Sequence, residues 1–219
     1  MRHAPTHLRG LAATRWVIDA STLTAAGLAG LAESGGGGGS AVLSALNTPG
    51  GRITLSGAAE GDFANVEFPH LIGNSGGSMR AWSLEVEGLS CTGTHGVVEA
   101  GFLSSVYESS QRTVLRWDTT GMHAMTTGGA ATATMKRGAV NAISGISAGI
   151  LVDVSDGSTA NASATGWVGG VEVELTGGVH ASGMLEPKIT HYGAGEIGFR
   201  SLIVTAYWGA RGDVLTKVI

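Results

Sequence analysis

The chain has 219 residues, of which 43% are hydrophobic and 14% are charged, and this composition excludes disorder throughout. The formal net charge is −4 and the 13 lysine and arginine residues are scattered, which excludes the clustered positive surface of a nucleic-acid binder. Because Cys91 is the only cysteine, a disulfide scaffold is excluded, and no run of about 20 apolar residues predicts a membrane span.

The N-terminal residues 1–14 are expected to form an arm in front of a single domain over residues 15–219. Arg2 and Arg9 in this arm, together with Arg15 at its end, are expected to dock on an acidic surface of an assembly partner. The segment Ala25–Glu33, AAGLAGLAE, is the only stretch that predicts a helix.

Five consecutive glycines lie between Ser34 and Ser40. A run of this composition is typical of a flexible tether between modules or of a surface loop inside one domain. We favour a loop at residues 34–40 within the domain, because the upstream RWVIDAS has the character of a strand. If the glycines are ordered, we expect a neighbouring subunit to hold them.

Short strand-like runs fill the rest of the chain, with turn signals between them. Leu84 and Val86 alternate with Glu85 and Glu87, the period of a strand with one buried face. The runs with strand character are Arg52–Ser56, Asn65–Phe68, Met79–Glu87, Val97–Tyr107, Thr113–Asp118, His123–Thr126, Ala131–Lys136, Ile150–Val154, Val171–Leu175, Phe199–Trp208 and Asp213–Val218. The 37 glycines supply turns between them. The pattern predicts an all-β antiparallel sandwich of the jelly-roll type.

Several phrases carry a family resemblance. Ser56-Gly57, Gly61-Asp62-Phe63 and Val66-Glu67-Phe68-Pro69 are similar to the "sGxgDyv.vp" phrase of the concanavalin A-like, or laminin-G-like, lectin and glucanase sandwich. Met79–Val86 resembles the strand "fTvefWvk" that follows it there, and Ile197–Trp208 resembles the closing strand. Arg15–Ser21, RWVIDAS, is similar to the "lWlDAsd" opening of such sandwiches in bacteriophage and bacterial surface proteins. The resemblance implies this fold, which carries lectins, glycanases and structural modules alike.

Serine-centred and carboxylate motifs do not predict catalysis. Residues 73–77 and 145–149 fit G-x-S-x-G, but a strand follows each serine where an esterase would have a helix. The resemblance implies a pair of carboxylates in an E-x-D-x-x-E run for its glycanases, and no such run is present. We therefore predict that the chain is not an enzyme.

Asp153 and Asp156 lie on a turn after a strand, beside two serines. Such oxygen ligands suit Ca²⁺, although the spacing does not match an EF-hand, and an ordinary Asp-Gly turn explains the same residues. We expect no cofactor other than this Ca²⁺.

Four aromatic or polar residues are candidates for carbohydrate binding: Trp117, Asp118, Asn161 and Trp167. Indole rings stack on sugar faces, and nearby Asp or Asn groups bind sugar hydroxyls. The alternative is that both tryptophans belong to the core of the sandwich.

These features favour a non-enzymatic structural protein of a bacteriophage virion, in the tail, spike or capsid, with a role in attachment to the host surface. Its partners would be other virion proteins, copies of itself in a trimer, and a cell-surface glycan, with no nucleic acid and no membrane. It would be assembled in the host cytoplasm. The alternative is an extracellular lectin or adhesin of a bacterial surface.

Overall fold

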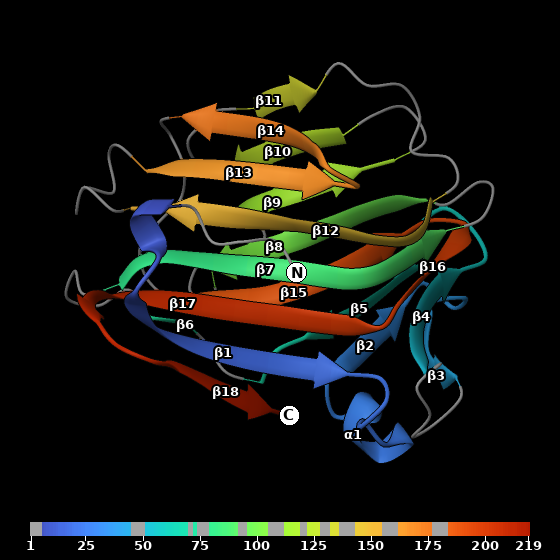
Figure 1. Ribbon diagram of the computed structural model, residues 1–219. Coiled ribbons are helices and arrows are strands. Elements are labelled where there is room, and N and C mark those ends of the chain that lie inside the picture. Colours follow the sequence, from blue (N-terminus) through green and yellow to red (C-terminus); the bar gives the residue numbers. More distant parts are fainter. Residues whose placement is uncertain are drawn as a thin grey trace.

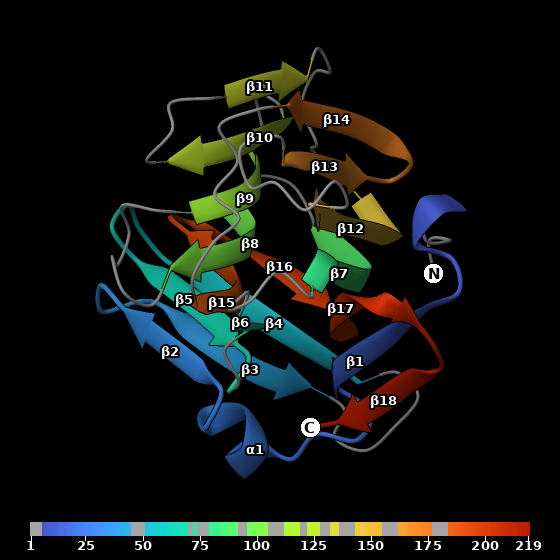
Figure 2. The same cartoon turned by 90° about the vertical axis from the view of Figure 1, so that its left-hand side faces the viewer.

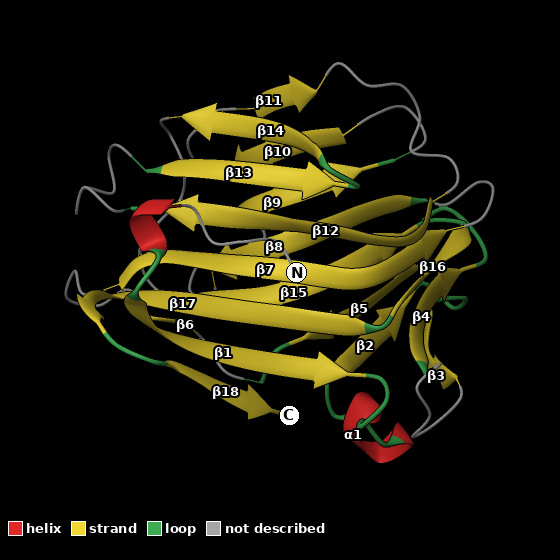
Figure 3. Cartoon of the chain, viewed as in Figure 1, coloured by secondary structure: helices red, strands yellow, loops and turns green. Residues whose placement is uncertain are grey.

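The computed structural model describes residues 6–44, 51–69, 72–73, 79–91, 96–104, 112–118, 122–127, 132–135, 143–154, 162–176 and 184–219. Strands dominate these residues and form two stacked sheets that are antiparallel apart from one parallel edge pair, seen face-on in Figures 1 and 3 and edge-on in Figure 2. The predicted all-β sandwich is confirmed.

Sheet A has ten strands, and β7 lies at its centre. On one side of β7 the order runs outward through β12, β13 and β14, and on the other side through β17, β1 and β18, with β16, β4 and β3 branching from the far end of β7. The strands of sheet A are β1 (Leu11–Asp19), β3 (Ser40–Ser44), β4 (Arg52–Gly57), β7 (Met79–Cys91), β12 (Ile143–Asp153), β13 (Ser163–Val168), β14 (Val171–Thr176), β16 (Gly195–Phe199), β17 (Ser201–Arg211) and β18 (Val214–Val218).

Sheet B has eight strands in the order β11, β10, β9, β8, β15, β5 and β2, with the short β6 beside β15. Their bounds are β2 (Ala32–Gly35), β5 (Phe63–Glu67), β6 (Ile72–Gly73), β8 (Val97–Ser104), β9 (Arg112–Trp117), β10 (Met122–Thr127), β11 (Thr132–Met135) and β15 (Met184–Tyr192). Strands far apart in the sequence are therefore neighbours here, β15 between β8 and β5 above all.

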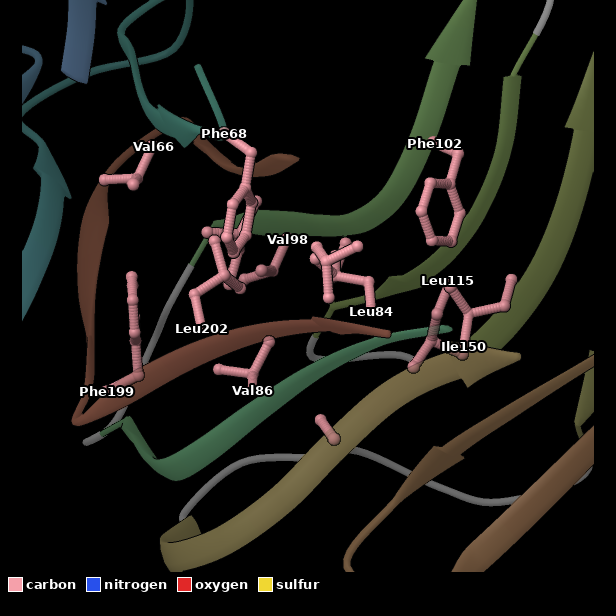
Figure 4. Packing of buried hydrophobic residues seen from close by; sticks show 14 of the residues in the cluster. Val66, Phe68, Leu84, Val86, Val98, Phe102, Leu115, Ile150, Phe199 and Leu202 are labelled. Carbon is pink, nitrogen blue, oxygen red and sulfur yellow. The ribbon is translucent and has the colours of Figure 1, made fainter. Parts of the chain in front are cut away.

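The core lies between the two sheets, where side chains from each point toward the other (Figure 4). The alternation predicted in β7 is confirmed, because Leu84 and Val86 are buried while Glu85 and Glu87 lie on the opposite face. Trp82 packs edge-to-face on Phe102 of the other sheet, with 6.4 Å between ring centroids and 88° between planes. Cys91 is a buried free thiol in this core.

The helix α1 (Ala25–Ala29) is shorter than the predicted Ala25–Glu33. It begins at Thr24, whose hydroxyl accepts a hydrogen bond from the Gly27 N–H at 3.0 Å, and it ends at Gly30. The last two residues of the predicted helix, Ala32 and Glu33, instead belong to β2, which pairs with β5. Tertiary pairing here overrides local helix propensity.

The glycine run connects β2 of sheet B to β3 of sheet A. The carboxylate of Asp62 accepts hydrogen bonds from the N–H groups of Gly38, Ala58 and Ala59 at 3.1, 2.8 and 2.9 Å. A methyl group at Gly39 would overlap the carbonyl oxygen of Phe63, so only glycine fits there. The turn around Asp62 in the same chain holds the run, which corrects the expectation that a neighbouring subunit would be needed.

The N-terminal residues do not form a separate arm up to residue 14. A 3₁₀ turn, η1 (Thr6–Leu8), lies in front of sheet A (Figure 1), and β1 pairs with β17 from Leu11 onward. Leu8 is buried, and the His7 Nε2 lies 2.5 Å from the Asp153 Oδ2 at the end of β12. Residues 11–14 thus belong to the sheet. No helix among the described residues is long and apolar enough to cross a membrane.

Candidate functional site

Trp117 does not form a sugar platform. It lies on β9 with its side chain in the core, and its exposed fraction is 0%. A fully buried indole cannot stack on a ligand, so this assignment from the sequence is corrected. Asp118 follows it directly after the strand and is half-buried.

Trp167 lies on the other sheet, on the outer face of sheet A. Its neighbours Ala164 and Val168 face the core, and its own ring covers Gly149, where a methyl group would lie 2.6 Å from the indole. The indole N–H donates to the Ser147 hydroxyl at 3.1 Å, and that hydroxyl donates to Glu85 at 3.1 Å. Only 6% of Trp167 is exposed, so the structure assigns it to packing and corrects its proposed role in sugar stacking.

The other predicted residues are scattered. Asp153 lies at the end of β12 beside His7, and the described residues contain no group of three His, Cys, Asp or Glu side chains that could hold a metal. Arg9 is exposed in the turn after η1, and Arg15 is half-buried on β1. Arg2, Asp156 and Asn161 lie outside the described residues.

The outer face of sheet B carries three of the eight polar or charged side chains that are buried among the described residues, Asn65, Glu99 and Thr190. In β8, Val98, Ala100 and Phe102 face the core, and so Glu99 faces outward. In β15, Ile189 faces the core, which places Thr190 on the outer face.

Strand register brings five of these outward residues side by side across five strands. Glu33 of β2 pairs with Asn65 of β5, Asn65 with Thr190 of β15, Thr190 with Glu99 of β8, and Glu99 with Arg116 of β9. We call these five residues the polar row. Next to Arg116, the register position on β10 is taken by His123.

Glu99 anchors one end of the polar row. Only 6% of it is exposed, and its two carboxylate oxygens pair with Arg112 Nη1 at 2.5 Å and Arg116 Nη1 at 3.4 Å. A buried carboxylate needs such compensation. Because Arg112 and Arg116 are partly exposed, one carboxylate fixes two guanidinium groups at the surface.

Tyr192 lies beside this ion-pair cluster on the outer face. It is 38% exposed and is the one aromatic residue among the large hydrophobic residues exposed in the described chain. Burial of the phenol and then the charge of Glu99 raise the pKa of Tyr192, while Arg112, a hydrogen bond with Thr190, and Arg116 act in the opposite direction. The phenol therefore lies within electrostatic reach of the whole cluster.

The other end of the polar row is acidic. Burial raises the pKa of Glu67 above its ordinary range; Lys188 opposes this, and the nearby carboxylates of Glu186 and Glu33 add to it. Asn65, in the middle of this end, is 4% exposed, and its Nδ2 donates to Glu33 at 3.4 Å.

An exposed aromatic ring beside fixed charged and hydroxyl groups is an arrangement that binds sugars. The ring offers an apolar face to the C–H groups of a sugar, while guanidinium, carboxylate and hydroxyl groups bind its hydroxyls. The polar row with Tyr192 and Arg112 is the candidate site.

Sequence patterns alone did not reveal this site. Glu99 interrupts the apolar strand β8 at the alternate position, which is a local signal for an outward polar residue. Thr190 gives no such signal, because its strand β15 contains several other polar residues. Their proximity depends on β15 lying between β8 and β5, and nothing in the local pattern specifies that order.

Comparison with known proteins identifies the fold. No protein-family model and no curated protein sequence matches the chain, whereas solved structures do. The carbohydrate recognition domain of Emp46p, in its metal-free form, has a TM-score of 0.55 at 8% identity, covering 80% of this chain and 88% of that one. A Bacillus subtilis protein of unknown function with a galectin-like fold has a TM-score of 0.54 at 10% identity, covering 84% of this chain and 93% of that one.

The third similar structure is an endo-1,3-β-glucanase from Streptomyces sioyaensis, with a TM-score of 0.53 at 10% identity, covering 94% of this chain and 99% of that one. Together these likenesses define a concanavalin A-like, lectin-like sandwich, as the sequence resemblance implied. The prediction that the chain is not an enzyme is contradicted by this comparison. The same fold carries a glucanase, so the fold does not place the chain outside the enzymes.

Proposed function

We propose that the chain binds a carbohydrate on the outer face of sheet B. The Tyr192 ring is the stacking surface, and the polar row provides the hydrogen bonds. The observation that carries this proposal is the exposed Tyr192 beside a buried Glu99 that two arginines hold in place.

The physical support for the proposal is the desolvation cost of burying the Glu99 carboxylate on the outer face of sheet B. A carboxylate is rarely buried on an outer sheet face, where an apolar side chain would pack at lower desolvation cost. Its retention there is explained if Arg112 and Arg116 must point at a ligand in one fixed orientation. The lectin-like fold of the chain is consistent with such a ligand.

A glycan array with matched tyrosine variants tests the proposal. The array should include neutral oligosaccharides, such as laminarihexaose, and acidic ones, such as alginate oligomers. We expect Tyr192→Ala to abolish binding and Tyr192→Phe to retain most of it. Tyr207→Ala is the control, because Tyr207 lies on β17 on the outer face of sheet A. Absence of binding by the wild type to every glycan, or equal binding by Tyr192→Ala, would reject the proposal.

We also propose that this glycan-binding module is part of a bacteriophage virion, as a trimer in contact with other virion proteins. The support is the resemblance of RWVIDAS to the opening of such sandwiches in bacteriophage and bacterial surface proteins. Purified phage particles should contain the chain in a copy number divisible by three. Light scattering of the isolated protein should give the mass of a trimer, and a monomer absent from particles would contradict this assignment.

A further inference from the structure

Asn65 has a hydrogen-bonding requirement that the described chain does not meet. Its side chain is 4% exposed, and its Oδ1 has no donor within the described residues. The amide nitrogen makes one long contact, 3.4 Å to Glu33. Buried side-chain acceptors in native proteins nearly always have a donor, so this oxygen calls for an explanation.

The neighbours of Asn65 on the sheet do not supply that donor. Glu33 pairs with it on β2 and, when ionised, is an acceptor only. Thr190 pairs with it on β15, but no hydrogen bond joins the Thr190 hydroxyl to Asn65 Oδ1. Asn65 Oδ1 therefore stays without a donor among the described residues.

We propose that Asn65 Oδ1 accepts a hydrogen bond from a hydroxyl group of the ligand and makes Asn65 a specificity-determining residue. This inference rests on the carbohydrate-binding function proposed above. The side chain of Glu33 covers Asn65 in the absence of a ligand. Glu33 is exposed, it belongs to the edge strand β2, and its contact with Asn65 is long. It moves aside when a sugar hydroxyl takes its place.

The position of Asn65 also specifies the length and charge of the ligand. Two strand spacings of about 4.8 Å separate Asn65 from Glu99, so about 10 Å lie between the two contact points. This is longer than one sugar ring, and the ligand is therefore an oligosaccharide that crosses β5, β15 and β8. Its residue at Asn65 is neutral, because the carboxylates of Glu33 and Glu67 repel an acidic sugar.

The experiment measures stability and binding on the same variants. Asn65→Leu removes the acceptor and keeps the approximate volume of the side chain. Binding is measured by calorimetry with laminarihexaose, cellohexaose and mannohexaose, and with the three monosaccharides. We expect the wild type to bind at least one hexasaccharide and no monosaccharide, and Asn65→Leu to bind it at least about tenfold more weakly with an unchanged or raised Tm.

Control variants separate this inference from the proposed function. Thr113→Val changes a buried polar residue on the inner face of β9 and should leave binding unchanged. If Tyr192→Ala loses binding while Asn65→Leu keeps it, the proposed function stands and the role of Asn65 is rejected. The same rejection follows if Asn65→Leu lowers Tm, since the amide is then structural, or if only acidic glycans bind. If no glycan binds to the wild type, both proposals are rejected.

Discussion

The two outer faces of the sandwich differ in how their buried polar groups are satisfied. On sheet A the buried outward residues include the apolar Ile203, Trp167, whose indole N–H donates to Ser147, and the polar Ser201, whose hydroxyl donates to Asp19. On sheet B they include the apolar Val114 and the polar Asn65, Glu99 and Thr190, and Asn65 Oδ1 has no donor among the described residues. The longest strand of sheet A, β7, has 13 residues, and the longest strand of sheet B, β15, has nine.

This contrast supports the outer face of sheet B as the proposed ligand-binding face. Apolar burial on sheet A adds to stability, as does the buried Leu8 of η1 in front of that sheet (Figure 1). Burying Glu99 and Asn65 on sheet B has a desolvation cost, and Asn65 Oδ1 has no donor among the described residues to offset its share. A face that retains costly polar groups is the better candidate for function.

The largest expected effect is that of Trp167→Ala on sheet A. Removal of a buried indole should lower the free energy of unfolding by about 3 kcal/mol, because it leaves a cavity beside Gly149. Tyr192→Ala on sheet B should lower it by less than about 1 kcal/mol, because the phenol is 38% exposed. Urea denaturation of both variants measures the difference.

Trp167→Phe is the matched control, since it keeps most of the apolar surface and loses only part of the stability. Glycan binding should be unaffected by either Trp167 variant when measured below its Tm. Equal stability losses for Trp167→Ala and Tyr192→Ala would contradict the assignment of one face to packing and the other to binding.

Glu99→Gln should have the next largest effect. The variant keeps the shape of the side chain but leaves Arg112 and Arg116 without their counter-charge. We expect a loss of about 1–2 kcal/mol, less than for a fully buried pair because both arginines are partly exposed, together with weaker glycan binding. Glu85→Gln on sheet A is the control, because its amide oxygen can still accept from Ser147. A Glu99→Gln protein with wild-type stability and binding would show that the ion-pair cluster is incidental.

The sequence predicted the strands well and the site poorly, for physical reasons. Period-two alternation defined β7 and β14, where Leu84 and Val173 are buried and their glutamate neighbours are not. The strand around Trp117 contains the apolar pair Val114–Leu115, which obscures the alternation of its two faces. Arg112 and Arg116, four residues apart and therefore on one face, were the overlooked signal that Trp117 lies on the opposite, core-facing side.

The candidate site could not be predicted from the sequence, because it depends on the order of the strands in sheet B. Asn65, Glu99 and Thr190 come from three segments far apart in the chain. Local patterning gives the face of each residue within its strand but not which strands are neighbours. The end of α1 was missed for the same reason, since pairing with β5 makes Ala32–Gly35 a strand.

A smaller effect is expected for Ser147→Ala on sheet A. The Ser147 hydroxyl links the Trp167 indole to Glu85, and its loss leaves a buried N–H without its acceptor. We expect a decrease of about 1 kcal/mol in the free energy of unfolding and no change in glycan binding. Ser147→Thr restores a hydroxyl and should recover part of the loss. A fully stable Ser147→Ala protein would mean that the indole N–H is not desolvated on this face.

The smallest expected effect is the response of stability to pH. This response has opposite signs on the two outer faces. On sheet A, burial of Asp19 opposes its ionisation, but hydrogen bonds from Ser21 and Ser201 and the charge of Arg200 outweigh it and lower its pKa below the ordinary 3.8. Its stabilisation is therefore present above pH 3.8 and is lost as the pH falls through the lowered pKa. On sheet B the pKa of Glu67 is raised above its ordinary 4.5, so its stabilisation is present below pH 4.5 and is lost as the pH rises through the raised pKa.

Asp19→Asn should thus be less stable than the wild type at pH 7, by less than about 1 kcal/mol after solvent screening, and the difference should shrink as the pH falls below 3.8. Glu67→Gln should be as stable as the wild type or more stable at pH 7, because the wild type must ionise a carboxyl group beside other carboxylates, and this difference should vanish below pH 4.5. Thermal unfolding of the three proteins from pH 2.5 to 7 measures both differences. If both variants shift Tm in the same direction at pH 7, the electrostatic distinction between the two faces is wrong. The Asp19 carboxylate is fixed by its own hydrogen-bond donors, whereas the Glu67 carboxylate lies among other carboxylates. Loss of the negative charge must therefore change Tm in opposite directions in the two variants.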